Sequence, residues 1–126
     1  MTKDKKILVT DDSIFAREVI KDILTRNGYN NIIEAADGIE AVEMYEKENP
    51  DLVLMDLIMD KMDGVEALEK IMEKDKNAQI IVASAVGQET IVNQCMKLGS
   101  KGYIVKPVDE KKLLIEIKKM LRKNSD

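Results

Sequence analysis

The sequence predicts an α/β fold in which one doubly wound, five-stranded parallel sheet is covered by helices on both faces. Two patterns support this: five short apolar runs alternate with five longer amphipathic segments, and polar residues follow most of the apolar runs. The length of 126 residues is room for one domain with its own core and not for two. We therefore expect a single domain over residues 1–126, with its core at about 6–122.

The predicted strands are short and mostly rich in β-branched residues, which is typical of strands buried on both faces of a parallel sheet. In order, they are the segments 7–9, 32–33, 52–55, 80–83 and 103–105. Because strand-helix-strand crossovers are right-handed, the alternation predicts parallel neighbours. We expect the strand order 2-1-3-4-5 that is known from flavodoxin-like folds.

The predicted helices carry apolar residues three and four positions apart, so each has one apolar face that can cover the sheet. Asn27-Gly28 ends the first helix, and Asn49-Pro50 ends the second. The third begins after Asp63-Gly64, and Gly99 ends the fourth. In order, the helices include the segments 16–24, 39–45, 65–72, 91–96 and 113–121.

The composition excludes several classes of function. The chain has 24 acidic and 20 basic residues, hence a net charge of −4, which argues against nucleic acid as the main partner. One Cys and no His exclude Cys/His zinc sites and any Ser-His or Cys-His nucleophile pair. No apolar run approaches the ~20 residues of a membrane span, and none at the N-terminus is long enough for a signal peptide. We therefore expect a cytoplasmic protein.

Polar side chains follow four of the five predicted strands. Asp11-Asp12 follows the first strand, Asp56 the third, Ser84 the fourth and Lys106 the fifth. Ligands of such sheets bind outside the carboxyl ends of the strands, where these side chains meet. An Asp after a strand is often only a helix cap, but coincidence at four strand ends is improbable. We expect three carboxylates, a hydroxyl and an ammonium in one shallow crevice.

These residue types indicate phosphoryl chemistry assisted by a metal. Clustered carboxylates repel each other unless a cation lies between them. Oxygen ligands without His or thiolate favour Mg²⁺ or a similar hard ion. A carboxylate beside such an ion can attack phosphorus and form an aspartyl phosphate, while the metal and a Lys neutralise the transferring group.

Taken together, these residues resemble the receiver domain of two-component response regulators, from Ile7 to about Leu121. The combination of short motifs is highly specific, although each motif alone is weak. The motifs are Ile-Leu-Val-Thr-Asp-Asp-Ser at 7–13, Asp-Leu-Val-Leu-Met-Asp-Leu-Ile-Met at 51–59, Met-Asp-Gly at 62–64, Ser-Ala at 84–85 and Lys-Pro at 106–107.

The resemblance implies a role for each site residue. Asp56 resembles the phosphoacceptor, Asp12 a direct ligand of Mg²⁺, and Asp11 a ligand that acts mostly through water. Asp56 and the backbone carbonyl of Ile58 complete the implied metal site. Ser84 resembles the switch hydroxyl, and Lys106 the Lys that pairs with the phosphoryl group. The remaining implied features are the switch aromatic Tyr103 and a cis peptide bond before Pro107.

The sequence departs from the family pattern at two positions near the site. Asp60 occupies a position where the family usually has Pro, so the loop loses a fixed φ and gains a negative charge. Thr10 replaces a more usual aliphatic residue, and its hydroxyl needs a hydrogen-bond partner if it is buried.

Among receivers, Ser-Ala-Val-Gly-Gln at 84–88 is similar to a run in CheY-type chemotaxis regulators. The implied function is a signalling switch, not an enzyme, in chemotaxis or motility control. Phosphorylation of Asp56 would change the face formed by the fourth helix, fifth strand and fifth helix. We expect a monomer whose partners are a CheA-like histidine kinase, a flagellar motor protein or adaptor as target, and a phosphatase.

Three alternatives remain at this point. One is a phosphorelay intermediate receiver that passes its phosphoryl group to a His phosphotransfer protein. Another is a haloacid-dehalogenase-type phosphatase, which typically carries a carboxylate where this chain has Ile58. The third is a flavodoxin-like cofactor carrier, which would need a hydroxyl- and glycine-rich phosphate loop where this chain has Asp11-Asp12, a pair that repels phosphate unless a metal intervenes.

Overall fold

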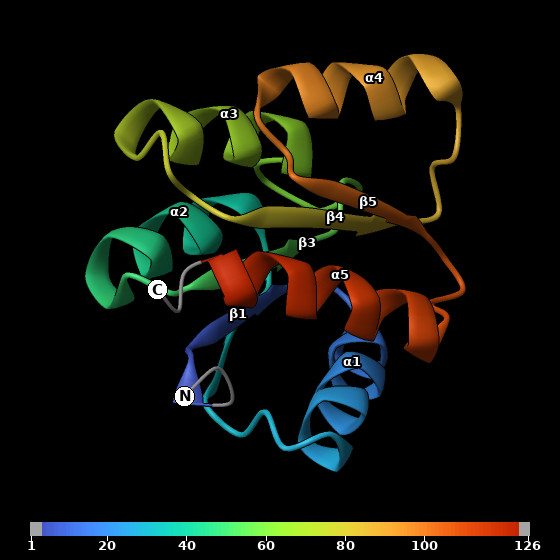
Figure 1. The fold of residues 1–126 in the computed structure, drawn as a ribbon. Helices are drawn as coiled ribbons and strands as arrows, with labels where there is room; N and C mark the ends of the chain where they lie inside the picture. Colours follow the sequence, from blue (N-terminus) through green and yellow to red (C-terminus); the bar gives the residue numbers. More distant parts are fainter. Residues whose placement is uncertain (1–3, 124–126) are drawn as a thin grey trace.

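A computed structural model describes residues 4–123 and shows the predicted parallel sheet at the centre of the molecule (Figure 1). The sheet order is β2-β1-β3-β4-β5, and every neighbouring pair is parallel, which confirms the predicted order. Residues 1–3 and 124–126 of the predicted domain lie outside the described residues. The strands are β1 (Ile7–Thr10), β2 (Ile32–Ala35), β3 (Leu52–Met55), β4 (Ile80–Ser84) and β5 (Gly102–Val105).

Five helices cover the sheet in two layers, with α2, α3 and α4 on one face and α1 and α5 on the other (Figure 1). Each layer encloses its own cluster of buried apolar side chains, so the sheet is buried on both faces. No helix within residues 4–123 is long and apolar enough to cross a membrane. The helices are α1 (Ile14–Arg26), α2 (Gly38–Glu48), α3 (Gly64–Lys74), α4 (Glu89–Leu98) and α5 (Glu110–Lys123).

Side-chain caps determine where three helices begin, directly after the loops that leave the sheet. The side chain of Ser13 accepts a hydrogen bond from the backbone of Ala16, at 3.2 Å, and begins α1. Asp37 and Asp63 cap α2 and α3 in the same way, each at 2.9 Å. These caps hold the first residues of each helix against the sheet edge that carries the predicted site.

The strand register brings the predicted site residues to one level. Thr10 of β1 lies beside Met55 of β3, so the residues that follow these two strands are neighbours. Ser84 of β4 lies beside Val105 of β5, which places Ser84 next to Lys106. The backbone N–H of Lys106 also donates to the carbonyl of Ser84, at 2.8 Å.

Thr10 is the last residue of β1 and is only 2% exposed. Its hydroxyl has no hydrogen-bond partner within residues 4–123. A buried hydroxyl that loses its contact with water and gains no partner costs about 1–3 kcal/mol. We therefore expect Thr10 to lower the free energy of unfolding relative to an aliphatic residue at this position.

We expect Thr10→Val to raise the free energy of unfolding by about 1 kcal/mol, because the methyl group that replaces the hydroxyl needs no partner. Urea denaturation followed by circular dichroism measures the change. Thr90→Val, at an exposed threonine of α4, serves as the control and should change it by less than about 0.5 kcal/mol. A less stable Thr10→Val variant would show that the hydroxyl is satisfied in solution.

Candidate metal and phosphoacceptor site

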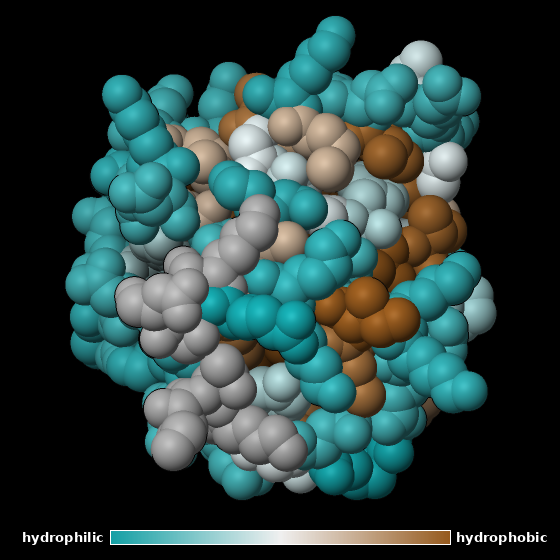
Figure 2. All heavy atoms as spheres, in the orientation of Figure 1, coloured by the Kyte–Doolittle hydropathy of each residue, from teal (hydrophilic) through white to brown (hydrophobic). Residues whose placement is uncertain are grey.

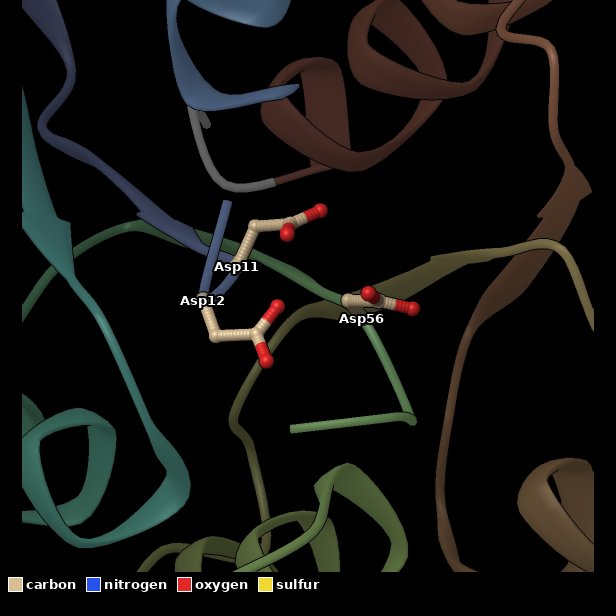
Figure 3. A group of neighbouring side chains, drawn as sticks. All are labelled: Asp11, Asp12 and Asp56. Atoms are coloured by element: carbon tan, nitrogen blue, oxygen red, sulfur yellow. The ribbon is translucent and has the colours of Figure 1, made fainter. Parts of the chain in front are cut away.

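The three predicted carboxylates lie together at the carboxyl ends of β1 and β3 (Figure 3). Asp11 and Asp12 follow β1, and Asp56 follows β3. Each offers an oxygen within 4.8 Å of an oxygen of the other two. Asp11 and Asp56 are buried, at 2% and 8% exposed, whereas Asp12 is exposed. The structure thus brings together the group that the sequence pattern predicts.

Asp11 is held by contacts on both oxygens of its carboxylate. Oδ1 accepts a hydrogen bond from the backbone N–H of Ser13, at 2.9 Å. Oδ2 accepts one from the ammonium of Lys106, at 2.6 Å, and forms an ion pair with it. Asp11 therefore links the β1–α1 turn to the end of β5.

Asp56 is buried, and both oxygens of its carboxylate have a nearby donor. Its Oδ1 accepts a hydrogen bond from the backbone N–H of Leu57, at 2.8 Å, and its Oδ2 lies 3.5 Å from the ammonium of Lys106. Burial raises the pKa of Asp56 above its usual range, and the positive charge of Lys106 opposes this shift. A carboxylate of raised basicity beside a fixed cation has the character of a nucleophile.

Lys106 is the cation that contacts these carboxylates within the described part of the chain. Burial alone would lower the pKa of Lys106, but the hydrogen bond to Asp11 and the charge of Asp56 together raise it. The ammonium is therefore held in its charged form. The peptide bond between Lys106 and Pro107 is cis, as the family resemblance implies.

The donor set fits a hard divalent cation. Three carboxylates face one ammonium, and no hydrogen bond or ion pair of the Asp12 side chain is found among residues 4–123. The excess negative charge and the all-oxygen ligands are what Mg²⁺ requires. Asp11, Asp12 and Asp56 would hold the ion. Ile58 follows in the β3–α3 loop with its side chain 62% exposed, and its carbonyl stays a predicted ligand.

Ser84 and Tyr103 lie beside the site on β4 and β5. Ser84 is fully buried, and its hydroxyl accepts a hydrogen bond from the backbone N–H of Val86, at 3.2 Å. The hydroxyl of Tyr103 donates to the backbone carbonyl of Val86. Both predicted switch residues thus contact one residue of the β4–α4 loop.

The β3–α3 loop, where Asp60 replaces the usual Pro, follows an unusual path. Lys61 adopts a left-handed backbone conformation with φ of 66°. Its ammonium lies 3.8 Å from the buried carboxylate of Asp37, which caps α2. Asp60 itself is exposed, so its added charge faces solvent.

Two residues contact the site that sequence patterns did not assign to it. Arg17 donates from Nη1 to the backbone carbonyl of Asp11, at 2.5 Å. Gly64 packs so closely on the segment that follows β3 that an added Cβ would lie 2.0 Å from the carbonyl oxygen of Asp56 and 2.6 Å from Cα of Leu57. The Asp63-Gly64 pair indicated a helix start, and only its place in the Met-Asp-Gly motif pointed to the site.

Comparisons with known proteins agree with this geometry. The family model described as the response regulator receiver domain matches residues 7–118. Chemotaxis protein CheY of Treponema pallidum is 49% identical, over 93% of this chain and 83% of that relative. Chemotaxis protein CheY of Bacillus subtilis is 45% identical, over 92% and 97%. A crystal structure of a CheX–CheY–BeF3–Mg²⁺ complex from Borrelia burgdorferi superposes with a TM-score of 0.88 at 44% identity, over 91% of this chain and 87% of the other.

The close approach of Gly64 to the backbone of Asp56 generates a testable prediction. Gly64→Ala cannot be accommodated unless the backbone of Asp56 or of α3 moves, because both nearest neighbours are main-chain atoms. We expect a loss of about 1–3 kcal/mol in the free energy of unfolding. Gly87→Ala is the matched control, since its Cβ would meet only side-chain atoms of Val105, at 3.3 Å. Equal stability losses in the two variants would contradict the argument.

Proposed function

Because this chain belongs to the response regulator receiver domain family, we propose that Asp56 accepts a phosphoryl group from a histidine kinase, in a reaction that requires Mg²⁺. Receiver domains are signalling switches. Because the chain belongs to this family, the phosphatase and the flavodoxin-like carrier are no longer needed as explanations of the site. The observation that carries the assignment to Asp56 is its position: it is a buried carboxylate close to two further carboxylates and 3.5 Å from the ammonium of Lys106.

The residues of the site divide the work of the transfer. An oxygen of Asp56 forms the new bond to phosphorus as the bond from phosphorus to the donor histidine breaks. Lys106, already 3.5 Å from Asp56, places positive charge where the phosphoryl oxygens arrive. Asp11 and Asp12 would hold Mg²⁺ together with Asp56. When bound, the metal neutralises charge on the transferring group.

We further assign the switch to Ser84 and Tyr103. The Ser84 hydroxyl lies at the end of β4, and its partner Val86 also accepts the hydrogen bond of Tyr103. A shift of the Ser84 hydroxyl toward a phosphoryl group on Asp56 would therefore move the β4–α4 loop and Tyr103 together. Small shifts of this kind are sufficient to change a packed surface.

The surface whose shape would change with this shift lies over β5 and α5. A groove of about 460 Å³ is lined by Tyr103 and by residues of β5 and α5, including Val105 and Ile115, which are 48% and 57% exposed. Apolar residues gather in this region of the molecule, on the right of the view in Figure 2. We propose that the α4–β5–α5 face binds the downstream protein.

The relatives support a place in chemotaxis. Those with 45–49% identity are named chemotaxis protein CheY, and the solved complex holds CheX as a partner of CheY. We propose that a CheA-like kinase is the phosphodonor and that a flagellar motor protein or adaptor is the target. A phosphatase would end the signal.

Phosphorylation with acetyl phosphate and Mg²⁺ tests the acceptor. We expect intact-mass spectrometry to show a gain of about 80 Da, one HPO₃ group, in the wild-type protein and none in Asp56→Asn. EDTA should abolish the gain in the wild type. Asp60→Asn, an exposed carboxylate of the neighbouring loop, is the matched control and should keep it. A full adduct on Asp56→Asn would place the acceptor elsewhere.

Ser84→Ala tests the switch separately from the chemistry. We expect this variant to be phosphorylated on Asp56 but to show smaller changes at the amides of residues 102–105, because the hydroxyl that follows the phosphoryl group is missing. Two-dimensional ¹⁵N NMR spectra before and after addition of acetyl phosphate measure these changes. Thr90→Val, which alters an exposed hydroxyl of α4, should respond like the wild type. Equal responses of wild type and Ser84→Ala would remove Ser84 from the switch.

A further inference from the structure

Arg17 connects three elements around the β1–α1 turn. It lies near the start of α1, and its side chain is only 14% exposed. Nη1 donates to the backbone carbonyl of Asp11, at 2.5 Å, and Nε donates to the carboxylate of Glu34 on β2, at 2.9 Å. The guanidinium thus bridges the turn that carries Asp11 and Asp12 to the edge strand of the sheet.

Glu34 is itself held by a second cation. Its other oxygen accepts a hydrogen bond from the ammonium of Lys21, one turn further along α1, at 2.9 Å. The hydrogen bonds and charges of Lys21 and Arg17 keep the pKa of Glu34 below its usual range. Glu34 therefore stays charged and limits rotation of the Arg17 guanidinium, whose donors are arranged in a planar fork.

The carbonyl that Arg17 holds belongs to the peptide unit between Asp11 and Asp12. That unit is planar, so the direction of its carbonyl determines where the Cα of Asp12 lies. The other side of Asp11 is held too, because its backbone N–H donates to the carbonyl of Ala35, at 3.1 Å. The Asp12 side chain has no hydrogen bond or ion pair within the described residues, so only its backbone positions it.

We propose that Arg17 is a positioning residue for divalent cation binding. By holding the Asp11–Asp12 peptide, Arg17 determines where the Asp12 carboxylate lies. Glu34 and Lys21 support it by fixing the guanidinium. The inference rests on the proposed function, since it assumes that Asp11, Asp12 and Asp56 hold Mg²⁺. Residues behind the direct ligands of a metal typically change metal affinity by about 10- to 100-fold when they are replaced.

Simple electrostatics predicts the opposite effect. Arg17 is a cation near a cation site, so its charge alone weakens Mg²⁺ binding by repulsion. If charge were all that mattered, Arg17→Met would bind Mg²⁺ more tightly than the wild type. If Arg17 positions Asp12, the same variant binds Mg²⁺ more weakly. The sign of the change therefore separates the two accounts.

The experiment is calorimetric titration of the full chain with Mg²⁺ alone, without phosphoryl donor, at a temperature where circular dichroism shows every variant folded. We expect the dissociation constant of Arg17→Met to rise about tenfold or more. Arg17→Lys keeps the charge, but its single ammonium cannot bond the Asp11 carbonyl and Glu34 as the planar guanidinium does. This variant should therefore also bind Mg²⁺ more weakly. Arg26→Met is the matched control: Arg26 lies on the same helix and pairs with Asp22 and Glu110, so its loss should leave the constant unchanged.

A double-mutant cycle identifies the residue through which Arg17 acts. In an Asp12→Asn background, Arg17→Met should cost less Mg²⁺ affinity than in the wild type. Equal or tighter Mg²⁺ binding by Arg17→Met would overturn the positioning role alone. No Mg²⁺ binding by the wild type would overturn the proposed metal site and this inference with it. Should Arg17→Met fail to fold, Arg17→Lys and Glu34→Gln decide the question, because both must then bind more weakly.

Discussion

Mutual repulsion of three carboxylates at one sheet edge is the constraint around which this structure is arranged. Two of the three are buried, where repulsion is strongest and water contributes least. Lys106 contacts Asp11 and Asp56, whereas no ion pair of Asp12 is found among residues 4–123. Three carboxylates thus face one ammonium, and this excess of negative charge favours the binding of a divalent cation.

Backbone geometry keeps these charges close in spite of their repulsion. Parallel pairing of β1 and β3 fixes the level of Asp11 and Asp56, and the backbone N–H of Asp56 donates to the carbonyl of Thr10, at 3.0 Å. Ser13 caps α1 and also donates to Asp11. Sheet pairing and helix capping thus oppose the repulsion between the carboxylates. The apolar layers on both faces of the sheet stabilise this pairing and capping.

Much of this architecture was predictable because it depends on local patterns. Apolar runs, helix periodicity and stop signals such as Gly28 predicted the alternation of strands and helices in a parallel sheet, and the strand order was that of flavodoxin-like folds. Polar residues after the strands predicted which side chains meet. Arg17 and Gly64 were not predictable in this way, because their roles depend on contacts made across the folded chain. The left-handed conformation of Lys61 likewise follows from the packing of the β3–α3 loop and not from its residue type.

The groove over β5 and α5 has a consequence for protein engineering. None of its lining residues is one of the three carboxylates, although Val105, which lines it, lies beside Ser84 in the sheet. On the proposal that this face binds the downstream protein, recognition and phosphoryl transfer use different residues of the chain. On the same proposal, a library varied at Lys112, Ile115 and Glu116 would select for binding to other proteins and leave the three carboxylates unchanged, so the domain could be engineered as a part of synthetic signalling circuits.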